Sequence, residues 1–246
     1  MTSSIPDLSV IIPCYNEEER LAPSLDDVLA TLKDEPITFE IVAVDDGSDD
    51  GTVALINQYT EKHPHQVRLL ALGENSGKGV AVTRGMLEAQ GKRRLFMDAD
   101  GSVPFREYRK LWKILDNGED LAIGSRVAPG KSELVTKPTR RWVGWCFRQT
   151  LRMIGMNLVD DSQCGFKMFS AYCAEEVFTR IRSQGFGFDL EAIYLTRKLG
   201  FHFFEVRVEW HHRIGSKVDL LQDSIRILRD AFLTPIRHGR VRKISR

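Results

Sequence analysis

The sequence predicts an α/β protein with a doubly wound, mostly parallel sheet and helices on both faces. Two observations predict this class. Short apolar runs rich in branched residues alternate with stretches of helical character through the first half of the chain. The length of 246 residues, with 42% hydrophobic residues, is enough for one large domain with a continuous core. Disorder and coiled coil are not expected from this composition.

The first half predicts strands and helices in alternation. Apolar runs expected to be buried parallel strands lie in residues 8–13, 40–45, 67–72, 94–97 and 121–124. Stretches expected to be helices lie in residues 17–34, 51–63, 77–90 and 104–116. Cap and turn residues at positions 50–52 and 75–77 mark two of the helix starts.

The second half predicts two amphipathic helices. The first, in residues 139–158, places Arg141, Arg148 and Arg152 in one stripe with two tryptophans beside it, which suits either a membrane interface or a core-packing helix with a solvated face. The second, in residues 219–234, groups apolar side chains on one side: Leu221, Ile225, Leu228 and Phe232. A basic tail follows it and could meet anionic lipid or be a solvated terminus.

The charge is unevenly distributed, although the net charge is only +1. Residues 1–138 carry 23 Asp and Glu against 16 Lys and Arg, whereas residues 139–246 carry 11 against 19. The second part is therefore expected to meet something anionic. No part of the chain predicts a nucleic-acid partner, and the oligomeric state does not follow from the sequence.

The cysteines and the hydropathy limit the cellular context. The four cysteines have unrelated spacings, so neither a zinc site nor a disulfide framework is expected, and they are interpreted as free thiols in a reducing cytosol. The N-terminal residues are polar and no apolar run reaches about 18 residues, so we expect neither a signal peptide nor a spanning helix. Any membrane contact is expected to be peripheral.

Asp98-Ala99-Asp100 is the most informative motif, because it places two carboxylates at the end of the fourth expected strand. Such close carboxylates repel each other, and both stay ionised most easily beside a hard divalent cation such as Mg²⁺ or Mn²⁺. An isolated Asp-x-Asp is more often a solvated acidic turn. Other motifs at strand ends decide between these readings.

Three more segments follow expected strands at the edge where α/β sheets bind ligands. Residues 13–17 follow the first strand and residues 45–48 the second, where Asp45 could accept the N–H of a pyrimidine. Residues 75–79 follow the third and offer backbone N–H groups and the Lys78 cation to phosphate. The spacing of a P-loop is missing, and no Gly-x-Gly-x-x-Gly follows the first strand, which argues against a dinucleotide enzyme.

These motifs closely resemble the family 2 glycosyltransferases, which have a GT-A fold. The family's Pro-x-Tyr-Asn-Glu, Val-Asp-Asp-Gly-Ser and Asp-x-Asp stand here as residues 13–17, 44–48 and 98–100. Within the family, the second half looks like the dolichyl-phosphate β-glucosyltransferases. The matching motifs there are Gly124-Ser125-Arg126, residues 163–167, residues 188–191, and Trp210 with Gly215-Ser216-Lys217.

The resemblance implies a single GT-A catalytic domain in residues 1–218, with residues 219–246 forming the amphipathic helix and basic tail. Residues 1–138 would be the nucleotide-sugar half and residues 139–218 the acceptor half. We expect the chain to depart from the eukaryotic enzymes in having no N-terminal membrane anchor. It departs from mannosyl relatives by having Gly101-Ser102 after the Asp-x-Asp, which leaves the third metal ligand open, with Ser102 a candidate.

The resemblance also implies the reaction and its residues. The enzyme would be inverting and metal-dependent, with Mg²⁺ or Mn²⁺, and would move a sugar, expected to be glucose from UDP-glucose, to a polyprenyl or dolichyl phosphate at the cytoplasmic face of an anionic membrane. The expected donor-site residues are Pro13, Tyr15, Glu17, Asp45, Asp46, Lys78, Asp98 and Ala99. Asp98 and Asp100 would hold the metal. The expected catalytic residues are Asp100, Asp161, Arg126 and Lys217, and the expected acceptor-phosphate residues are Arg126, Arg140 and Arg141.

Three alternatives stay open at this point. The same donor site could serve an enzyme that glycosylates a soluble glycan or protein. It could also take GDP-mannose as the donor. A non-catalytic protein that binds a nucleotide sugar is the third alternative, against which the intact Asp-x-Asp, Lys78 and Arg126 argue.

Overall fold

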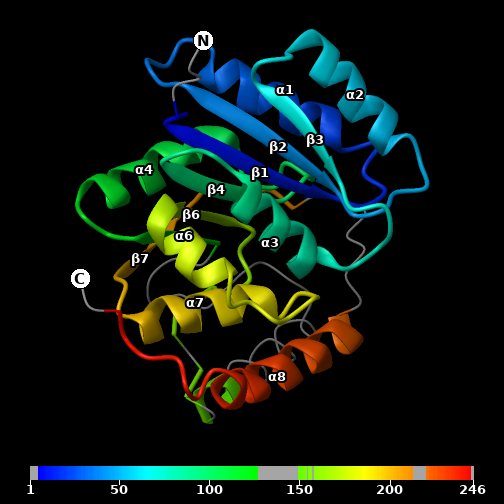
Figure 1. The fold of residues 1–246 in the computed structure, drawn as a ribbon. Helices are drawn as coiled ribbons and strands as arrows, with labels where there is room; N and C mark the ends of the chain where they lie inside the picture. Colours follow the sequence, from blue (N-terminus) through cyan, green and yellow to red (C-terminus); the bar gives the residue numbers. More distant parts are fainter. Residues whose placement is uncertain (1–4, 127–148, 154, 157, 213–219, 245–246) are drawn as a thin grey trace.

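A seven-stranded sheet organises the protein (Figure 1). The computed structural model describes residues 5–126, 149–153, 155–156, 158–212 and 220–244. The strands are β1 (Leu8–Cys14), β2 (Phe39–Asp45), β3 (Val67–Ala71), β4 (Arg93–Met97), β5 (Leu121–Ser125), β6 (Phe166–Ser170) and β7 (Phe203–Arg207). Their order is β3-β2-β1-β4-β6-β5-β7. Every pairing is parallel except those of β6, which runs antiparallel to both β4 and β5.

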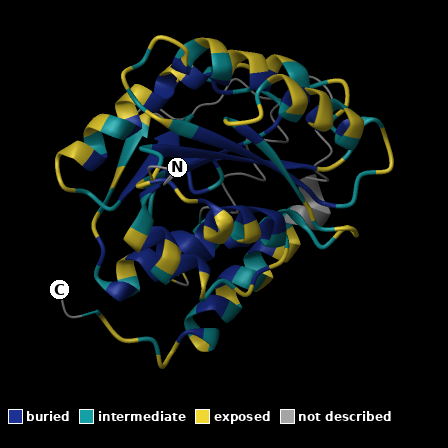
Figure 2. Cartoon of the chain, turned by 45° about the horizontal axis from the view of Figure 1, so that its top comes forward, coloured by how far each residue is buried: buried dark blue, intermediate teal, exposed yellow. Residues whose placement is uncertain are grey.

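Helices cover both faces of the sheet. The helices are α1 (Leu21–Leu32), α2 (Thr52–Lys62), α3 (Lys78–Glu88), α4 (Tyr108–Asp116), α6 (Ala171–Phe178), α7 (Phe188–Leu199) and α8 (Leu220–Arg237), with a 3-10 turn η1 (Phe105–Glu107) before α4. One core cluster packs α1, α2 and α4 on one face, and a second packs α3, α6 and α7 on the other. The central strands β1, β2, β4, β5 and β6 are almost entirely buried, whereas the edge strands β3 and β7 are partly exposed (Figure 2).

The structure confirms the predicted doubly wound sheet. All five expected strands form, and each of the four helices expected between them is present with slightly shorter bounds. Two strands were not predicted, β6 and β7. The sequence of β6 carries Lys167 among its apolar residues, and this lysine is fully buried, so hydropathy alone did not indicate a core strand. Of the helix expected in residues 139–158, the described residues 149–153 are helical, and residues 139–148 lie outside the described part.

A buried ion pair explains how a lysine can occupy the core. The Lys167 ammonium pairs with the Asp189 carboxylate, with side-chain exposures of 0% and 2%, and also donates to the carbonyl of Cys164 at 2.7 Å. Asp189 stands in the first turn of α7, so the pair fastens β6 to α7. Removing one partner of such a pair leaves an uncompensated charge without water.

Helix α8 forms an outer layer against α7 (Figure 1). It buries a face with the spacing of one helical stripe, made by Ile227, Ala231 and Thr234. Of the apolar residues that the sequence groups on one side, Leu228 packs against this layer, whereas Ile225 and Phe232 are exposed by 67% and 60%. Ala231 and Thr234 on the buried face are small and allow close approach to α7, whereas Ile225 and Phe232 lie outside.

The ion pair predicts a difference between two variants. Lys167→Ala should destabilise the fold by about 3–5 kcal/mol, because Asp189 stays buried without its partner. Arg84→Ala, which breaks the exposed pair with Glu88, should cost no more than about 0.5 kcal/mol. Urea denaturation measures the free energy of unfolding of both variants, provided that their m-values equal that of the wild type. If Lys167→Ala does not fold, Lys167→Met/Asp189→Leu should recover folding. Equal stability of Lys167→Ala and Arg84→Ala would contradict the prediction.

Candidate active site

The candidate site lies where β1, β2 and β4 end at the same edge of the sheet. Strand β1 pairs with both neighbours in parallel, and Cys14 at its end stands opposite Asp45 at the end of β2. The loop after β4 carries Asp98 and Asp100 to this edge. The structure therefore brings together the three strand-end motifs that the sequence indicated.

Hydrogen bonds join the loop after β1 to the loop after β2. Asn16 N donates to Ser48 Oγ at 2.9 Å, and Glu17 N donates to Thr52 Oγ1 at 2.7 Å. The Glu17 carboxylate is bound by Arg20 at 2.6 and 2.7 Å. Pro13 is buried within β1, whereas Tyr15 has 39% of its surface exposed. Among these residues, the Tyr15 ring is the one most accessible to a ligand.

Asp45 and Asp46 are both buried, and both bind backbone N–H groups. Asp45 accepts hydrogen bonds from Gly47 N and Ser48 N at 3.2–3.3 Å. Asp46 accepts from Ser76 N at 2.8 Å and from Gly77 N at 2.9 Å, and burial raises its pKa. The Asp46 carboxylate thus holds the loop that leads into α3.

The start of α3 differs from the sequence expectation. Residues 75–79 were expected to offer free backbone N–H groups to phosphate. In the structure, Ser76 N and Gly77 N bind Asp46, and Gly79 N donates to the Gln184 carbonyl at 2.7 Å. The Gln184 carbonyl is placed there by tertiary packing, which the local motif cannot indicate. Three of the backbone N–H groups in this turn are therefore engaged, whereas the Lys78 ammonium still supplies a positive charge that can meet an anion.

Asp98 stands between Lys78 and Gly165. Lys78 Nζ lies 2.6 Å from Asp98 Oδ1, and Asp98 N donates to the Gly165 carbonyl at 3.0 Å. A Cβ added at Gly165 would lie 2.1–2.3 Å from the Asp98 carboxylate atoms, so any other residue at this position would displace that carboxylate. Burial opposes the positive charge of Lys78, but Asp98, Asp189 and Asp100 together raise its pKa. Lys78 therefore stays an ammonium at neutral pH.

The turn around Asp100 is held by its own hydrogen bonds. Asp100 Oδ1 accepts from Ser102 N at 2.9 Å, and the Ala99 carbonyl accepts from Ser24 Oγ at 2.7 Å. Gly101 between them has a φ of +62°, a conformation that favours glycine. These bonds fix the direction of the turn without using Asp100 Oδ2.

The donor set fits a hard divalent cation. In the described part of the chain, Oδ2 of Asp98 and Oδ2 of Asp100 have no hydrogen bond, and carboxylate oxygens are the ligands that Mg²⁺ and Mn²⁺ prefer. Within the same residues, no group of three His, Cys, Asp or Glu side chains converges as a metal site. The two aspartates would need further ligands, such as the oxygens of a bound diphosphate.

Sequence reasoning did not place residues 210–212 at this turn. His211 N donates to the Ser102 carbonyl at 2.8 Å, so this segment lies directly beside the Asp-x-Asp turn. The His211 side chain is 52% exposed and lies 2.9 Å from Glu209. No local pattern connects positions 102 and 211, because their contact follows from β7 joining the far edge of the sheet.

Arg126 and Asp161 form a second charged pair near the ends of β5 and β6. Arg126 Nε and Nη2 each lie 2.7 Å from an Asp161 oxygen, and Arg126 N donates to Asp161 at 3.0 Å. Burial opposes the charge of Asp161, but Arg126 lowers its pKa below the ordinary value. The guanidinium lies over the Trp210 ring, 6.0 Å from its centroid. These contacts orient Arg126, and within the described residues its Nη1 has no hydrogen bond.

Three predicted residues, Arg140, Arg141 and Lys217, lie outside the described residues. Asp189 and Glu191 belong to the motif in residues 188–191 on which part of the family resemblance rests. Both are buried, Asp189 against Lys167 and Glu191 against His238, whose Nε2 lies 2.5 Å from Glu191 Oε1. In the structure they fasten α7 to its neighbours.

Comparison with known proteins identifies similar chains. The sequence model of Glycosyl transferase family 2 matches residues 9–178. The chain is 38% identical over 235 residues to a dolichyl-phosphate beta-glucosyltransferase of Dictyostelium discoideum, covering 91% of this chain and 72% of the relative. It is 37% identical over 247 residues to the Drosophila melanogaster protein of the same name, covering 94% and 75%.

A solved structure shows the fold. Glucosyl-3-phosphoglycerate synthase from Mycobacterium tuberculosis, in complex with Mn²⁺, uridine diphosphate and phosphoglyceric acid, superposes with a TM-score of 0.68 at 18% identity, covering 95% of this chain and 79% of that chain. The mixed seven-stranded sheet with helices on both faces is thus the expected GT-A fold.

The contact between Gly165 and Asp98 predicts the effect of one added methyl group. Gly165→Ala should weaken binding of UDP-glucose with Mn²⁺ at least tenfold, because the new Cβ displaces the Asp98 carboxylate. Gly239→Ala is the matched control, since its Cβ would meet only atoms at ordinary contact distances. Calorimetric titration with UDP-glucose and Mn²⁺ measures both. Wild-type affinity in Gly165→Ala would contradict the role given to Asp98.

Proposed function

We propose that this chain, which belongs to glycosyl transferase family 2, transfers glucose from UDP-glucose to a polyprenyl phosphate such as dolichyl phosphate, with inversion at the anomeric carbon. Family membership makes it a glycosyltransferase. The donor, the acceptor and the place of reaction are the parts proposed here.

Similarity of sequence to the dolichyl-phosphate beta-glucosyltransferases is the observation that carries this proposal. It extends over more than nine tenths of the chain, beyond the residues that the family model matches. It therefore includes the segments after residue 178, where the acceptor half is expected. Asp98, Asp100 and Lys78 support a nucleotide diphosphate as the donor, but many acceptors are compatible with them.

Donor chemistry requires charge to be neutralised on a leaving diphosphate. Asp98 and Asp100 would hold Mg²⁺ or Mn²⁺, and the metal would supply electrostatic stabilisation of the diphosphate. The Lys78 ammonium stands beside Asp98 and can meet the phosphate oxygens. The exposed Tyr15 ring and the loop held by Asp46 support placing the nucleoside between the ends of β1 and β2. Lys217 stays a predicted partner of the diphosphate.

Acceptor chemistry does not require a protein base. A phosphate monoester has a second pKa near ~6, so it is mostly dianionic at neutral pH and its oxygen is already a nucleophile. That oxygen attacks the anomeric carbon, a new C–O bond forms, and the bond to the diphosphate breaks, so UDP leaves with the electron pair. The geometry of Arg126 supports a role in binding the acceptor phosphate, since Asp161 orients its guanidinium and its Nη1 has no hydrogen bond to the described residues. Arg140 and Arg141 stay predicted partners of the same phosphate.

The proposal includes peripheral contact with an anionic membrane at its cytoplasmic face. None of the described helices has the length and hydropathy to cross a bilayer. The three described cysteines, Cys14, Cys164 and Cys173, are free thiols, which fits a reducing compartment. A polyprenyl chain partitions into lipid, so its phosphate would be met at the bilayer surface.

A panel of substrates tests the proposal. The protein is incubated with UDP-glucose or GDP-mannose, with Mg²⁺ or Mn²⁺, and with either a short polyprenyl phosphate in detergent or a water-soluble glycan, and products are read by mass spectrometry. We expect a glucosyl phosphate lipid from UDP-glucose alone. Transfer only to the glycan would refute the lipid acceptor, and transfer only from GDP-mannose would refute the donor.

The proposed metal ligands, Asp98 and Asp100, predict a loss of transfer activity when either carboxylate is removed. Asp98→Asn and Asp100→Asn should each lower kcat/KM for transfer at least about a hundredfold, because each removes a charge that faces the diphosphate. Chelation with EDTA should have the same effect on the wild type, and Mn²⁺ should restore it. Asp34→Asn, which changes an exposed aspartate, is the control. Full activity after EDTA treatment would exclude the metal-dependent reaction.

The ion pair between Arg126 and Asp161 predicts a variant that weakens acceptor binding and leaves donor binding unchanged. Arg126→Lys keeps the positive charge beside Asp161 but loses the two-pronged contact, so KM for polyprenyl phosphate should rise at least tenfold. Donor affinity, measured by calorimetry, should stay within twofold of wild type. A parallel loss of donor affinity would show that Arg126 does not act on the acceptor.

A further inference from the structure

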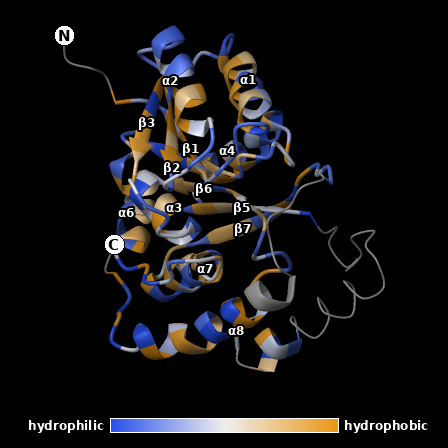
Figure 3. Cartoon of the chain, turned by 90° about the vertical axis from the view of Figure 1, so that its right-hand side faces the viewer, coloured by the Kyte–Doolittle hydropathy of each residue, from blue (hydrophilic) through white to orange (hydrophobic). Residues whose placement is uncertain are grey.

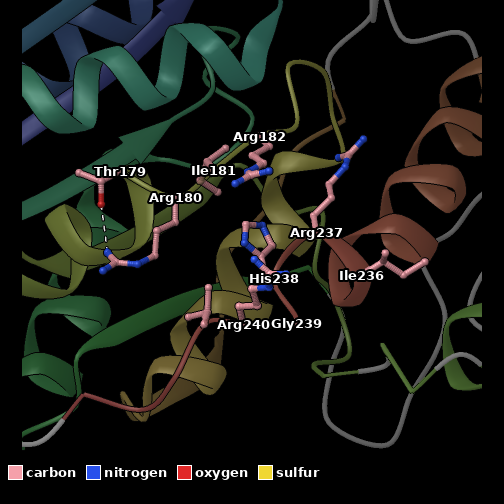
Figure 4. A pocket seen from close by; sticks show the side chains of 10 residues that line it. Thr179, Arg180, Ile181, Arg182, Ile236, Arg237, His238, Gly239 and Arg240 are labelled. Carbon is pink, nitrogen blue, oxygen red and sulfur yellow. Dashed lines mark hydrogen bonds between the residues drawn. The ribbon is translucent and has the colours of Figure 1, made fainter.

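A basic pocket that contains neither Asp98 nor Asp100 lies between the segment after α6 and the end of α8 (Figure 4). Its volume is about 620 Å³, within the size range of ligand sites. Its walls are residues 179–182 and residues 236–241. Four of the ten lining residues are arginines and none is acidic: Arg180, Arg182, Arg237 and Arg240.

The two walls are fastened to one buried carboxylate. Glu191 accepts hydrogen bonds from the backbone N–H groups of Arg182 and Ser183, the latter at 2.8 Å. The ring of His238, in the opposite wall, lies 2.5 Å from the same carboxylate. The pocket is thus preformed, and Glu191 is engaged by its walls.

Two of the four guanidinium groups are available to a ligand. Arg180 pairs with Glu176 at 2.9 Å, and Arg237 lies 3.3 Å from Asp230. The side chains of Arg182 and Arg240 are exposed and have no hydrogen bond or ion pair to the described residues. Arginine binds phosphate oxygens in a two-pronged geometry, so this pocket fits a phosphate group.

The surface beside the pocket is apolar. Ile225, Phe232 and Ile236 of α8 are exposed by 60–67%, and their spacing of seven and four residues puts them on one face of the helix. Ile236 also lines the pocket. Arg229 lies on the same face, where its long side chain can keep its charge in water while its stem contacts lipid. Figure 3 shows α8 as the outermost element below α7, with hydrophobic and hydrophilic residues alternating along it.

We propose that α8 lies in the interface of an anionic bilayer and that the basic pocket binds the phosphate of a phospholipid headgroup. The exposed stripe inserts among the acyl chains, and Arg182 and Arg240 bind the headgroup phosphate. A soluble phosphate ester would explain the arginines but would leave the adjacent apolar stripe in water. The inference rests on the proposed function only in expecting a membrane-borne acceptor.

The chain connects this pocket to the donor site. Two residues after Arg182, the Gln184 carbonyl accepts the N–H groups of Gly79 and Val80 at the start of α3. A headgroup bound at Arg182 would therefore hold the segment that supports the Lys78 turn. The headgroup site would orient the enzyme on the surface from which the acceptor phosphate is taken.

Sedimentation with vesicles tests the inference on the full chain. Wild type, Arg182→Gln/Arg240→Gln, and Ile225→Ser/Phe232→Ser are compared on phosphatidylcholine vesicles with and without phosphatidylglycerol. We expect each double variant to bind the anionic vesicles at least about tenfold more weakly than wild type. The control is Arg84→Gln/Arg109→Gln, which removes the same charge from exposed positions on α3 and α4 and should bind like wild type.

Two further arms separate the possible outcomes. Inorganic phosphate, added against chloride at matched ionic strength, should weaken vesicle binding of the wild type, because it competes with the headgroup phosphate for Arg182 and Arg240. Binding of phosphate without any loss of vesicle binding would assign the pocket to soluble phosphate and overturn the headgroup site. The headgroup site would also be overturned if either double variant bound vesicles as tightly as the wild type. It would be overturned too if the control Arg84→Gln/Arg109→Gln lost as much vesicle binding as the double variants. Transfer to short polyprenyl phosphate in detergent should be unchanged in Arg182→Gln/Arg240→Gln. Failure of that transfer in the wild type would instead refute the proposed function and leave the vesicle result standing.

Discussion

The position of the Asp98 carboxylate is the constraint on which the site depends. It stands at the end of β4, where Lys78 from α3 and Gly165 from the turn before β6 both contact it. The contact with Gly165 is possible because β6 runs antiparallel to β4, so the start of one strand lies beside the end of the other. If β6 ran parallel to β4, the end of β6, and not the turn before it, would lie beside Asp98. The single reversal in the sheet therefore builds the wall behind Asp98.

Charge balance at this edge depends on residues that no ligand needs to touch. Lys167 enters the core from β6 and is neutralised by Asp189 of α7, and Lys78 interacts with Asp98, Asp100 and Asp189. Burial raises the pKa of Asp189, Lys167 and Lys78 act against that shift, and Asp98 adds to it. Lys78 thus stabilises the acidic turn directly, and Lys167 neutralises the neighbouring Asp189. Such an arrangement lets two aspartates stand close together before a metal or a diphosphate arrives.

The two charged regions of the protein have different geometry. At the candidate site, aspartates and one lysine come from two neighbouring turns. Ser24 fixes the backbone of the Asp-x-Asp turn, and Asp46 and Gln184 fix the backbone at the start of α3. On the outer layer, arginines border an exposed apolar stripe on α8. The first geometry suits a small, highly charged leaving group, and the second suits a wide surface with fixed charges at its boundary. The charge asymmetry along the sequence reflects this division.

The sequence by itself determined the fold class, the strands and helices of the first half, and the three motifs at the edge of the sheet. Strand ends and their polar residues are local, and the carboxyl ends of parallel strands necessarily meet. The tertiary structure alone decided which of those polar groups remain accessible. Asp46 and the N–H groups of α3 bind protein partners, because residues 76, 77 and 184 fold against them. It also placed Lys167 in the core and the bulky residues of α8 outside. In each case the deciding contact joins residues far apart in sequence, and packing and desolvation outweigh the local pattern.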